Sequence, residues 1–332
     1  MKHLLLLIYL ISFGIYAQDA VFVPKKSKGQ LYEYAEFSNT GNSNLSIQEV
    51  IQNPALTYKH LESENHSVGF TSDNYWVRFK LKNNSESPST YYLETARPIT
   101  DVVGLYQINN GHIQHFESGD NIPFSEKQVA HRASMFKLTL PPQIEQQIYI
   151  HYKSDGETIN LPLKLYSESE FWIMNYKQQL FLGLFYGLLF LASVIYLFFY
   201  TSLKEKAFLY YGLYVFFIGL MQAALDGFMH EFIFPNGGYF NNRAVLITAL
   251  ATNFFLLKYC EYFLKVNEHL KGFMKGYRIF YILLIVLFTL LLISPKTLEI
   301  AYPLSNLNGL FSLLLILATT FTMRYKHIKI DP

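Results

Sequence analysis

Residues 180–200 read LFLGLFYGLLFLASVIYLFFY, a run of 21 residues in which no side chain carries a charge. At about 1.5 Å per residue, a helix of this length extends roughly 30 Å, the thickness of the hydrocarbon core of a bilayer. The run therefore predicts a transmembrane helix. It divides the chain into an upstream segment with alternating apolar side chains and a downstream segment with further long apolar runs.

The downstream segment contains four more apolar runs, separated by short loops. Together they predict five membrane spans, at about residues 180–200, 207–225, 244–263, 279–293 and 304–323. The loops on one side hold nine basic residues: Lys204, Lys206, Lys265, Lys271, Lys275, Arg278, Arg324, Lys326 and Lys329. The loops on the other side hold Arg243 and Lys296. Because basic loops stay inside, this bias predicts an inner (plasma) membrane protein with a cytoplasmic C-terminus and a periplasmic N-terminal domain.

The first residues predict export. Met1 to His3 form a short basic stretch, residues 4–16 are apolar, and the sequence ending at Ala17 matches the small-x-small cleavage pattern imperfectly. We interpret residues 1–17 as a signal peptide cut after Ala17. An uncleaved anchor is the alternative, and both export the domain that follows. The only cysteine, Cys260, lies in the third apolar run, so the exported domain has to fold without disulfides.

Residues 18–170 alternate between apolar and polar side chains in several short runs. Clear cases are residues 75–82, 136–140, 148–153 and 161–166. A period of two predicts strands with one buried and one wet face, and turn signals such as Asn110-Gly111 separate the runs. We therefore predict an exported antiparallel β-sandwich, in jelly-roll form, followed by an α-helical transmembrane region over residues 171–332.

Four motifs follow one another along the exported segment. They are YWVRF at residues 75–79 with Asn83 after it, RPITDVVGLY at 97–106, GDNIPF at 119–124, and INLPL at 159–163. Over about residues 30–168 they resemble the type-2 extracellular domain of the bacterial seven-transmembrane receptors with diverse intracellular signalling modules. The helices from residue 180 onward resemble the membrane region of the same family.

The resemblance implies a receptor. Its extracellular domain would be a carbohydrate-binding-like jelly roll that senses a small ligand. Its helices would pass the ligand's state to a kinase, cyclase, phosphatase or DNA-binding module in the cytoplasm. The chain departs from the family pattern because it holds five of the seven spans and no output module, so we expect a receptor truncated after five spans. In addition, Glu126-Lys127 replaces a basic residue that often follows the GDxxPF motif, with Arg132 further on.

One strand face carries the best candidates for a ligand site. Trp76, Arg78 and Lys80 share the face opposite the apolar side chains of their strand, and Tyr149 and His151 do the same in a later strand. An exposed aromatic ring beside a guanidinium suits stacking on a sugar or pairing with a carboxylate. The alternatives are a solvated outer face and contact with a neighbouring segment.

Two further candidates lie at turns, where binding residues concentrate. Arg97 and Asp120 are candidate ligand contacts, and a local salt bridge or an Asx turn is the alternative for each. His112 and His115 would lie on opposite faces of a strand, so we predict no metal site there. No Ser-His-Asp, Cys-His or paired-carboxylate spacing stands out, and no Walker-type loop does. We therefore predict no cofactor and no enzymatic activity.

The apolar runs contain few polar side chains, and the notable ones are Gln222, Asp226, Asn253, Lys258 and Glu261. Neutral amides inside a membrane predict hydrogen bonds between helices. Lys258 and Glu261, near the inner end of the third run, either pair or extend toward the headgroups. Asp226 ends the second run at the outer side, where it either couples to the domain above or caps the loop. Ionisable groups are absent from mid-membrane, which argues against a transporter.

The sequence thus predicts the sensory part of a membrane receptor. Its expected partners are a small ligand such as a sugar or a carboxylate, the lipid bilayer, and a cytoplasmic signalling module outside this chain. A second copy of the chain, forming a homodimer, is a further candidate partner, and nucleic acid is not expected as a partner. Two other classes stay open: an envelope ligand-binding or scaffold protein without signalling, and a membrane enzyme or transporter.

Overall fold

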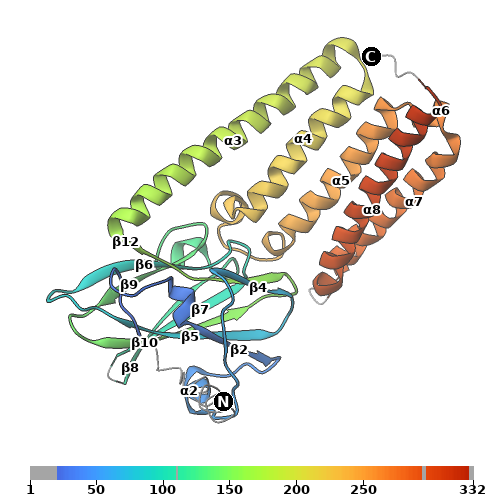
Figure 1. The fold of residues 1–332 in the computed structure, drawn as a ribbon. Coiled ribbons are helices and arrows are strands. Elements are labelled where there is room, and N and C mark those ends of the chain that lie inside the picture. The colour runs from blue at the N-terminus through green and yellow to red at the C-terminus, as the bar shows by residue number, and fades with distance from the viewer. Residues whose placement is uncertain (1–20, 110, 294–296, 329–332) are drawn as a thin grey trace, which may run out of the picture.

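The computed structural model describes residues 21–109, 111–293 and 297–328. The predicted signal peptide, with its cleavage site after Ala17, lies outside the described residues. Figure 1 shows a β-sheet domain at one end of the molecule and a row of long helices that extends away from it. The predicted order, an N-terminal β-domain followed by a helical bundle, is confirmed.

The larger sheet of the domain has seven strands, in the order β3-β2-β5-β10-β7-β8, with β1 paired in parallel to β5. These strands are β1 (Val21–Phe22), β2 (Glu36–Gly41), β3 (Lys59–His60), β5 (Asn74–Lys82), β7 (Val102–Asn109), β8 (His112–Ser118) and β10 (Glu145–Lys153). Apart from β1, every pairing in this sheet is antiparallel. The alternating runs at residues 75–82 and 148–153 are therefore neighbouring strands at its centre.

Two smaller sheets face the large one. The first has the order β12-β6-β9, and the second pairs β11 with β4. Their strands are β4 (Asn65–Phe70), β6 (Ser89–Ala96), β9 (Ser134–Leu140), β11 (Thr158–Pro162) and β12 (Lys164–Ser167). The domain also contains three short helices, η1 (Leu31–Tyr34), α2 (Ile47–Gln52) and η2 (Phe124–Glu126).

The core of the sandwich consists of the side chains that the alternation assigned to the buried face. Val77 and Phe79 of β5 pack with Ile150 of β10 and with Phe136 and Leu138 of β9, and all five side chains are at most 3% exposed. Burial of each such side chain stabilises the fold by about 1.5–3 kcal/mol. The β-sandwich is confirmed, and its jelly-roll form stays a prediction.

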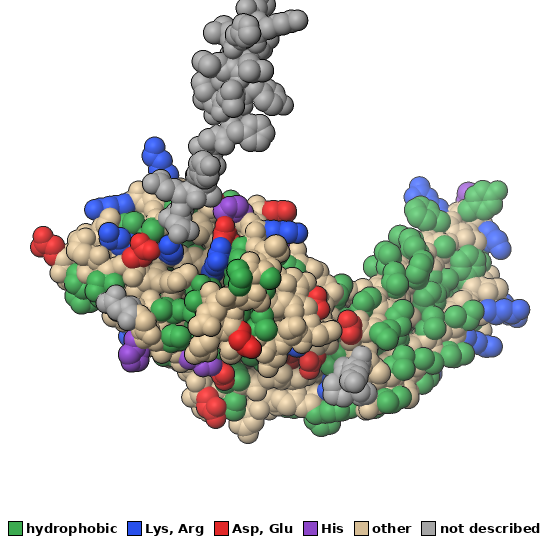
Figure 2. Space-filling model, turned by 90° about the horizontal axis from the view of Figure 1, so that it is seen from below, with side chains coloured by type: hydrophobic (Ala, Val, Ile, Leu, Met, Phe, Trp, Pro, Cys, Tyr) green, Lys and Arg blue, Asp and Glu red, His purple; other side chains and the backbone are tan. Residues whose placement is uncertain are grey.

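Five helices in the described part of the chain are long and apolar enough to cross a membrane, at the predicted places. They are α3 (Glu168–Leu203), α4 (Lys206–Leu225), α5 (Ala244–Phe263), α7 (Lys271–Ile293) and α8 (Leu298–Tyr325). Short helices η3 (Met229–Ile233), η4 (Asn241–Arg243) and α6 (Val266–His269) lie in the connections. Figure 2 shows hydrophobic side chains over this half and Lys and Arg side chains at its far end.

The helices extend beyond the predicted spans because apolarity marks only the part of a helix that lies in lipid. With 36 residues, α3 is about 54 Å long at 1.5 Å per residue, whereas the hydrocarbon core is about 30 Å thick. The first turns of α3 therefore lie outside the hydrocarbon core of the bilayer, next to the β-domain. Similarly, α8 begins at Leu298 and contains Pro303 in its second turn, although the sequence predicted a start at residue 304.

Candidate functional site

The predicted ligand face is assembled by two adjacent strands. β5 and β10 pair so that His151 lies opposite Trp76 and Tyr149 lies opposite Arg78. Side chains directly opposite each other in an antiparallel pair lie on the same face of the sheet. The candidates from two distant runs of the sequence therefore share one surface, which the sequence alone could not establish because it does not give the strand pairing.

A short helix covers half of this face. Ser46 is the N-cap of α2 and forms a capping box with Glu49. Ile47 and Val50 of α2 pack on Trp76 and Tyr149. Trp76 is only 1% exposed and stacks on the ring of His151 with the ring centroids 4.8 Å apart. Trp76 is therefore not an exposed stacking plane. The expectation of an open face is corrected here because the apolar side of α2 is buried against it.

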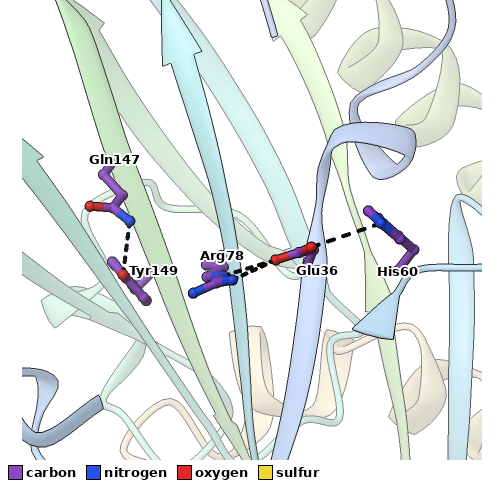
Figure 3. A network of polar contacts seen from close by, with 5 residues as sticks. All are labelled: Glu36, His60, Arg78, Gln147 and Tyr149. Atoms are coloured by element: carbon purple, nitrogen blue, oxygen red, sulfur yellow. Dashed lines mark hydrogen bonds and ion pairs between the residues drawn. The ribbon is translucent and has the colours of Figure 1, made fainter. Parts of the chain in front are cut away.

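Arg78 lies at the edge of this cover and takes part in a polar network (Figure 3). Its Nε and Nη2 atoms both donate to Oε2 of Glu36 in β2, at 3.0 and 2.8 Å. Its guanidinium carbon lies 3.6 Å from the centroid of the Tyr58 ring. His60 approaches the other oxygen of Glu36 at 3.8 Å. The guanidinium of Arg78 is thus paired with the Glu36 carboxylate and stacked on the Tyr58 ring.

A cavity of about 420 Å³ opens beside Arg78. It lies between β2, β5 and the segment that follows α2, and its polar lining consists of Glu36, Gln52, Asn53, Tyr58 and Arg78. Burial raises the pKa of Tyr58 to about 12, so its phenol stays protonated at neutral pH. The cavity thus offers both donors and an acceptor carboxylate, which is the set that hydroxyl groups require.

The other candidates of this face lie away from the cavity. Lys80 forms an ion pair with Glu145 at 3.6 Å. His151 bonds to Oδ1 of Asn74 at 2.9 Å, and burial lowers its pKa to about 4, so it is neutral at neutral pH. Tyr149 accepts a hydrogen bond from Gln147 at 2.8 Å, as Figure 3 shows. Of the predicted residues on this face, only Arg78 lines the cavity.

Arg97 and Asp120 lie in a different place, where the domain meets the outer end of the bundle. Asp120 is 6% exposed, and its backbone oxygen accepts a hydrogen bond from the Asn241 side chain of η4 at 3.2 Å. The neighbouring Asn242 donates to Oδ1 of Asn121 at 2.8 Å. Arg97 is half-buried, and its charge acts on the carboxyl of Glu157. We define this contact region between the domain and the bundle as the junction.

Three carboxyl groups are buried at the junction. Asp101 accepts hydrogen bonds from the Ser154 hydroxyl at 2.8 Å and the Asp155 backbone N–H at 2.7 Å, and burial raises its pKa to about 6. Burial raises the pKa of Asp120 and of Glu157 well above the usual range, and the charge of Asp101 adds to both shifts. The junction therefore favours the protonated form of Asp120 and Glu157, whereas Asp101, with a pKa of about 6, is mostly ionised at neutral pH.

Helix α8 docks directly on this acidic cluster. The hydroxyl of Tyr302 donates to Glu157, and the Ser72 hydroxyl donates to Glu299 at 3.4 Å. Gly156 has a φ of +110°, and a Cβ atom at this position would lie 2.5 Å from the Cα of Glu299. The turn before β11 can approach the start of α8 this closely only because residue 156 has no side chain.

The GDNIPF motif contacts the loop between α4 and α5. The backbone N–H of Phe124 donates to the carbonyl of Pro235 at 2.7 Å, and the Phe124 ring meets His230 edge-on with centroids 5.7 Å apart. Arg132 donates to the backbone oxygen of Asp226 at 3.3 Å and to the Gln178 side chain of α3 at 2.6 Å. The GDNIPF motif and the following Arg132 are thus part of the junction.

The domain also continues into the bundle without a linker. β12 ends at Ser167, which is the N-cap of α3 and forms a capping box with Glu170. Phe171 of α3 stacks on Tyr92 of β6 with ring centroids 4.2 Å apart. The smaller sheet and the first membrane helix are therefore one continuous, packed element.

Comparison with known families decides the identity. The family model described as "7TMR-DISM extracellular 2" matches residues 33–167, and the one described as "7TM diverse intracellular signalling" matches residues 178–329. This chain belongs to the seven-transmembrane receptors with diverse intracellular signalling. The predicted family is confirmed. It is a multi-pass membrane protein with an extracellular N-terminal domain.

The receptor has no match among curated proteins. Solved structures that resemble it include a β-glucosidase from Kluyveromyces marxianus in complex with glucose (10% identity, TM-score 0.24, covering 40% of this chain and 15% of that one). TmCBM61 in complex with β-1,4-galactotriose has 6% identity and a TM-score of 0.22, covering 41% and 90%. The GH31 α-xylosidase from Xanthomonas citri has 13% identity and a TM-score of 0.21, covering 40% and 15%. The receptor chain thus covers 15% of the length of the β-glucosidase.

The polar side chains in the receptor's membrane spans mostly contact one another. Asn253 donates to Oδ1 of Asn308 at 2.6 Å, which links α5 to α8. Lys258 and Glu261 form an ion pair at 2.9 Å. At the outer end of the bundle, Asp226 accepts hydrogen bonds from Tyr186 of α3 at 2.5 Å and Gln222 of α4 at 3.3 Å. Asp226 thus joins α3 to the end of α4, and its backbone oxygen contacts the domain through Arg132.

Sequence reasoning missed several residues of the receptor. Glu36 and Tyr58 beside the cavity, and Glu157, Asn241 and Tyr302 at the junction, each meet their partners across long sequence distances. No local pattern marks such contacts. The cover over Trp76 did carry a signal, because Ser46 followed by Glu49 is a capping box that starts a helix.

Proposed function

We propose that this chain is the input module of a receptor and that it binds a small hydroxylated ligand, carbohydrate-like in chemistry, in the cavity beside Arg78. The bundle then carries the ligand's state toward a cytoplasmic signalling partner. The observation that carries the proposal is the junction, where buried and partly buried polar contacts tie the domain to α3, to η4 just before α5, and to α8. A domain attached in this way cannot shift without moving the helices.

The chemistry of the cavity favours a neutral ligand over a carboxylate. Arg78 already gives two N–H groups to Glu36, so a ligand carboxylate would have to displace that partner and leave Glu36 unpaired. Hydroxyl groups can instead donate to the carboxylate of Glu36 and accept from the N–H groups of Arg78 that do not point to Glu36 and from the amides of Gln52 and Asn53. Such a ligand adds hydrogen bonds without breaking the existing ion pair.

Strand β10 connects the cavity to the junction. Tyr149 lies opposite Arg78 near its middle, and the strand ends at Lys153, directly before the two residues that bind Asp101. A ligand that orders the segment around Arg78 would change the equilibrium between two positions of this strand end. It can do so only by as much as its affinity differs between the two states.

The remaining features of the proposal concern topology and boundaries. The module comprises a signal peptide over residues 1–17, a periplasmic sensor domain over residues 18–170, and a membrane region over residues 171–332 in the inner membrane. The receptor-type family supports a sensor without enzymatic activity. An envelope ligand-binding or scaffold protein without signalling is the second candidate, and it predicts that ligand binding leaves the distance between the domain and α8 unchanged.

The ligand site predicts the effect of removing Arg78. Thermal-shift screening of sugars, neutral polyols and carboxylates against the full chain in detergent identifies the ligand, and calorimetry then measures its affinity. Loss of a charge-assisted hydrogen bond costs about 1.5–3 kcal/mol, so Arg78→Ala is expected to weaken binding roughly 10- to 100-fold.

Lys80→Ala is the matched control for this experiment. Lys80 lies on the same strand face and is also paired with a carboxylate, but it does not line the cavity. Its affinity for the ligand should stay at the level of the unmodified chain. Equal weakening in both variants, or unchanged affinity in a folded Arg78→Ala chain, would place the site elsewhere. A screen that yields only carboxylates would contradict the proposed ligand class.

The topology predicts where a reporter is active. A fluorescent protein fused after residue 330 is expected to fluoresce, and alkaline phosphatase fused there is expected to be inactive, because the basic loops place that end in the cytoplasm. The same fusions after residue 238, in the loop between α4 and α5, should give the opposite pattern. Strong phosphatase activity after residue 330 would refute the proposed orientation.

A further inference from the structure

A second cavity, of about 640 Å³, lies at the end of the bundle opposite the β-domain. It is formed by α3, the start of α4, the end of α5 and the short helix α6 that follows it, and Figure 1 shows these ends together. Its lining includes five charged residues: Glu205, Lys206, Glu261, Lys265 and Glu268. It has no part in the ligand site or the junction, so it is independent of the proposed function.

Glu261 is paired with Lys258 at 2.9 Å. The other four charged residues form no ion pair with another described residue, which leaves two ammonium groups and two carboxylates in the lining of the same cavity. Lys206 instead lies over the ring of Tyr262, with Nζ 5.4 Å from its centroid. Two unpaired charges of each sign in one cavity match a ligand that carries both signs itself.

The start of α4 adds a site for the negative part of such a ligand. Glu205 is the N-cap of α4, yet its side chain makes no hydrogen bond to the helix. The first residues of the helix, Lys206 and Ala207, line the cavity. The free N–H groups and the positive end of the helix dipole attract an anion such as a phosphate. Lys206 and Lys265 provide the countercharges.

The walls of the cavity are aromatic and lead to the lipid-facing surface. Tyr196, Phe208, Tyr211 and Tyr259 line it, and the Tyr196 and Tyr211 rings lie 4.3 Å apart. Apolar side chains that are more than 40% exposed flank this end, among them Phe199, Leu203 and Phe263. Amphipathic rings below charged groups are typical of the membrane interface, where one end of a ligand is polar and the other is apolar.

We propose that this cavity binds the headgroup of a zwitterionic phospholipid of the phosphatidylethanolamine type. The phosphate lies against Lys206, Lys265 and the N-terminus of α4, and the ammonium donates to Glu205 and Glu268. The acyl chains run along the exposed apolar side chains of α3 and α5. The volume is within the range of small-molecule sites, about 300–1,000 Å³. The lipid would hold the α3–α4 hairpin against the end of α5.

The carboxylates decide between lipid classes. Phosphatidylglycerol also carries a phosphate, but its uncharged glycerol would leave Glu205 and Glu268 without a cation. Phosphatidylcholine carries a cation, but its quaternary ammonium has no N–H to donate to them. Only a headgroup with a phosphate and a primary ammonium can bind both the lysines and the carboxylates. We therefore expect phosphatidylethanolamine to bind in preference to the other two lipids, which also carry a phosphate.

The experiment uses the full chain, purified in detergent, delipidated and mixed with equal amounts of the three lipids. Native mass spectrometry measures which lipid is retained, and the melting temperature measures its effect. We expect phosphatidylethanolamine to be retained preferentially and to raise the melting temperature most. A Lys206→Ala/Lys265→Ala chain should retain it roughly tenfold less or weaker still, because each lysine near the surface contributes to lipid binding.

Two controls make the result decisive. Lys204→Ala/Lys271→Ala removes the same charge from the same end of the bundle, outside the cavity, and should leave retention unchanged. Glu205→Gln/Glu268→Gln should shift the preference toward phosphatidylglycerol. Equal retention of the three lipids by the folded unmodified chain would overturn the proposal. So would an equal loss in the control variant, or equal stabilisation by inorganic phosphate alone, since neither requires a lipid headgroup in this cavity.

Discussion

Trp76→Ala is expected to lower the free energy of unfolding of the β-domain by about 3–5 kcal/mol, the usual cost of removing a large aromatic side chain from a core. Trp76 is almost fully buried, it packs under α2, and its ring contacts the rings of Tyr106 and His151. Its loss leaves a cavity that a helix of six residues cannot close without losing its own contacts. A large loss of stability is expected for a buried ring and would not be expected if Trp76 were an exposed ring that stacks on a ligand.

The chain contains its own control, because Trp172 is the only other tryptophan and is 45% exposed. Thermal unfolding of the full chain in detergent, followed by far-UV circular dichroism, should show a large loss of stability for Trp76→Ala and a small one for Trp172→Ala. Trp76→Phe should fall between them because it retains much of the apolar volume. If Trp76→Ala unfolds like Trp172→Ala and loses affinity for the ligand instead, the ring is a binding surface.

The contrast between the two faces of β5 shows what an alternating pattern can predict. The alternation separates Val77 and Phe79 from Trp76 and Arg78 correctly, and the first pair forms the core of the sandwich. It cannot tell whether the second face meets water, because that depends on whether another segment folds over it. Here α2 covers Trp76 and leaves Arg78 beside a cavity. The same strand face is therefore half core and half surface.

The membrane half was more predictable because the bilayer imposes length and apolarity on every span. The ends of the helices could not be predicted in this way, because the bilayer constrains only the residues that lie in its hydrocarbon core. α3 continues outward to Glu168 and joins β12 there. The sequence contains the signal for this start, Ser167 followed by Glu170, but its meaning depends on the domain that lies above the membrane.

The junction could not be predicted from the motifs that form it. Asp120 and Arg97 lie at turns, which fits ligand binding, a local bond and contact with another domain equally well. Asp120 contacts another domain through Asn241, whereas the charge of Arg97 acts on Glu157 within the same domain; both partners lie more than fifty positions away along the chain. A motif therefore indicates that a turn has a defined geometry, and only the fold shows what the turn contacts.

The buried carboxyls of the junction make stability depend on pH in a direction that can be worked out. The folded state raises the pKa of Asp101 from 3.8 to about 6 and that of Glu157 well above its usual range. Between the unfolded and folded pKa values the folded chain holds a proton that the unfolded chain has lost. Stability from these groups is therefore fully present below the unfolded pKa and is lost as pH rises, by about 1.4 kcal/mol per pH unit for each group.

Histidines oppose this trend in the unmodified chain. Burial lowers the pKa of His131, His151 and His230 from 6.5 to about 4, so each contributes stability that increases as pH rises through that window. The melting temperature of the unmodified chain combines both effects. Only a difference between two variants that share the histidines can isolate the carboxyl groups.

Glu157→Gln is expected to provide that difference. Glutamine keeps the oxygen that accepts from Tyr302 but cannot ionise, so the variant avoids the cost of burying a charge. Its melting temperature should exceed that of the unmodified chain, and the excess should grow as the pH rises from 4.5 to 8. The exposed Glu86 is the control, and Glu86→Gln should show a constant, small difference.

Tyr302→Phe tests the same contact from the other side. Removing the hydroxyl leaves a buried carboxyl without its donor, which costs about 1–3 kcal/mol. In the Glu157→Gln background the partner is a neutral amide, so the same change should cost less. Equal costs in both backgrounds would mean that Glu157 is not stabilised through Tyr302. A Glu157→Gln chain that is less stable at pH 8 than the unmodified one would show that the buried group acts as a charge, and the junction would then depend on ion pairing with Arg97.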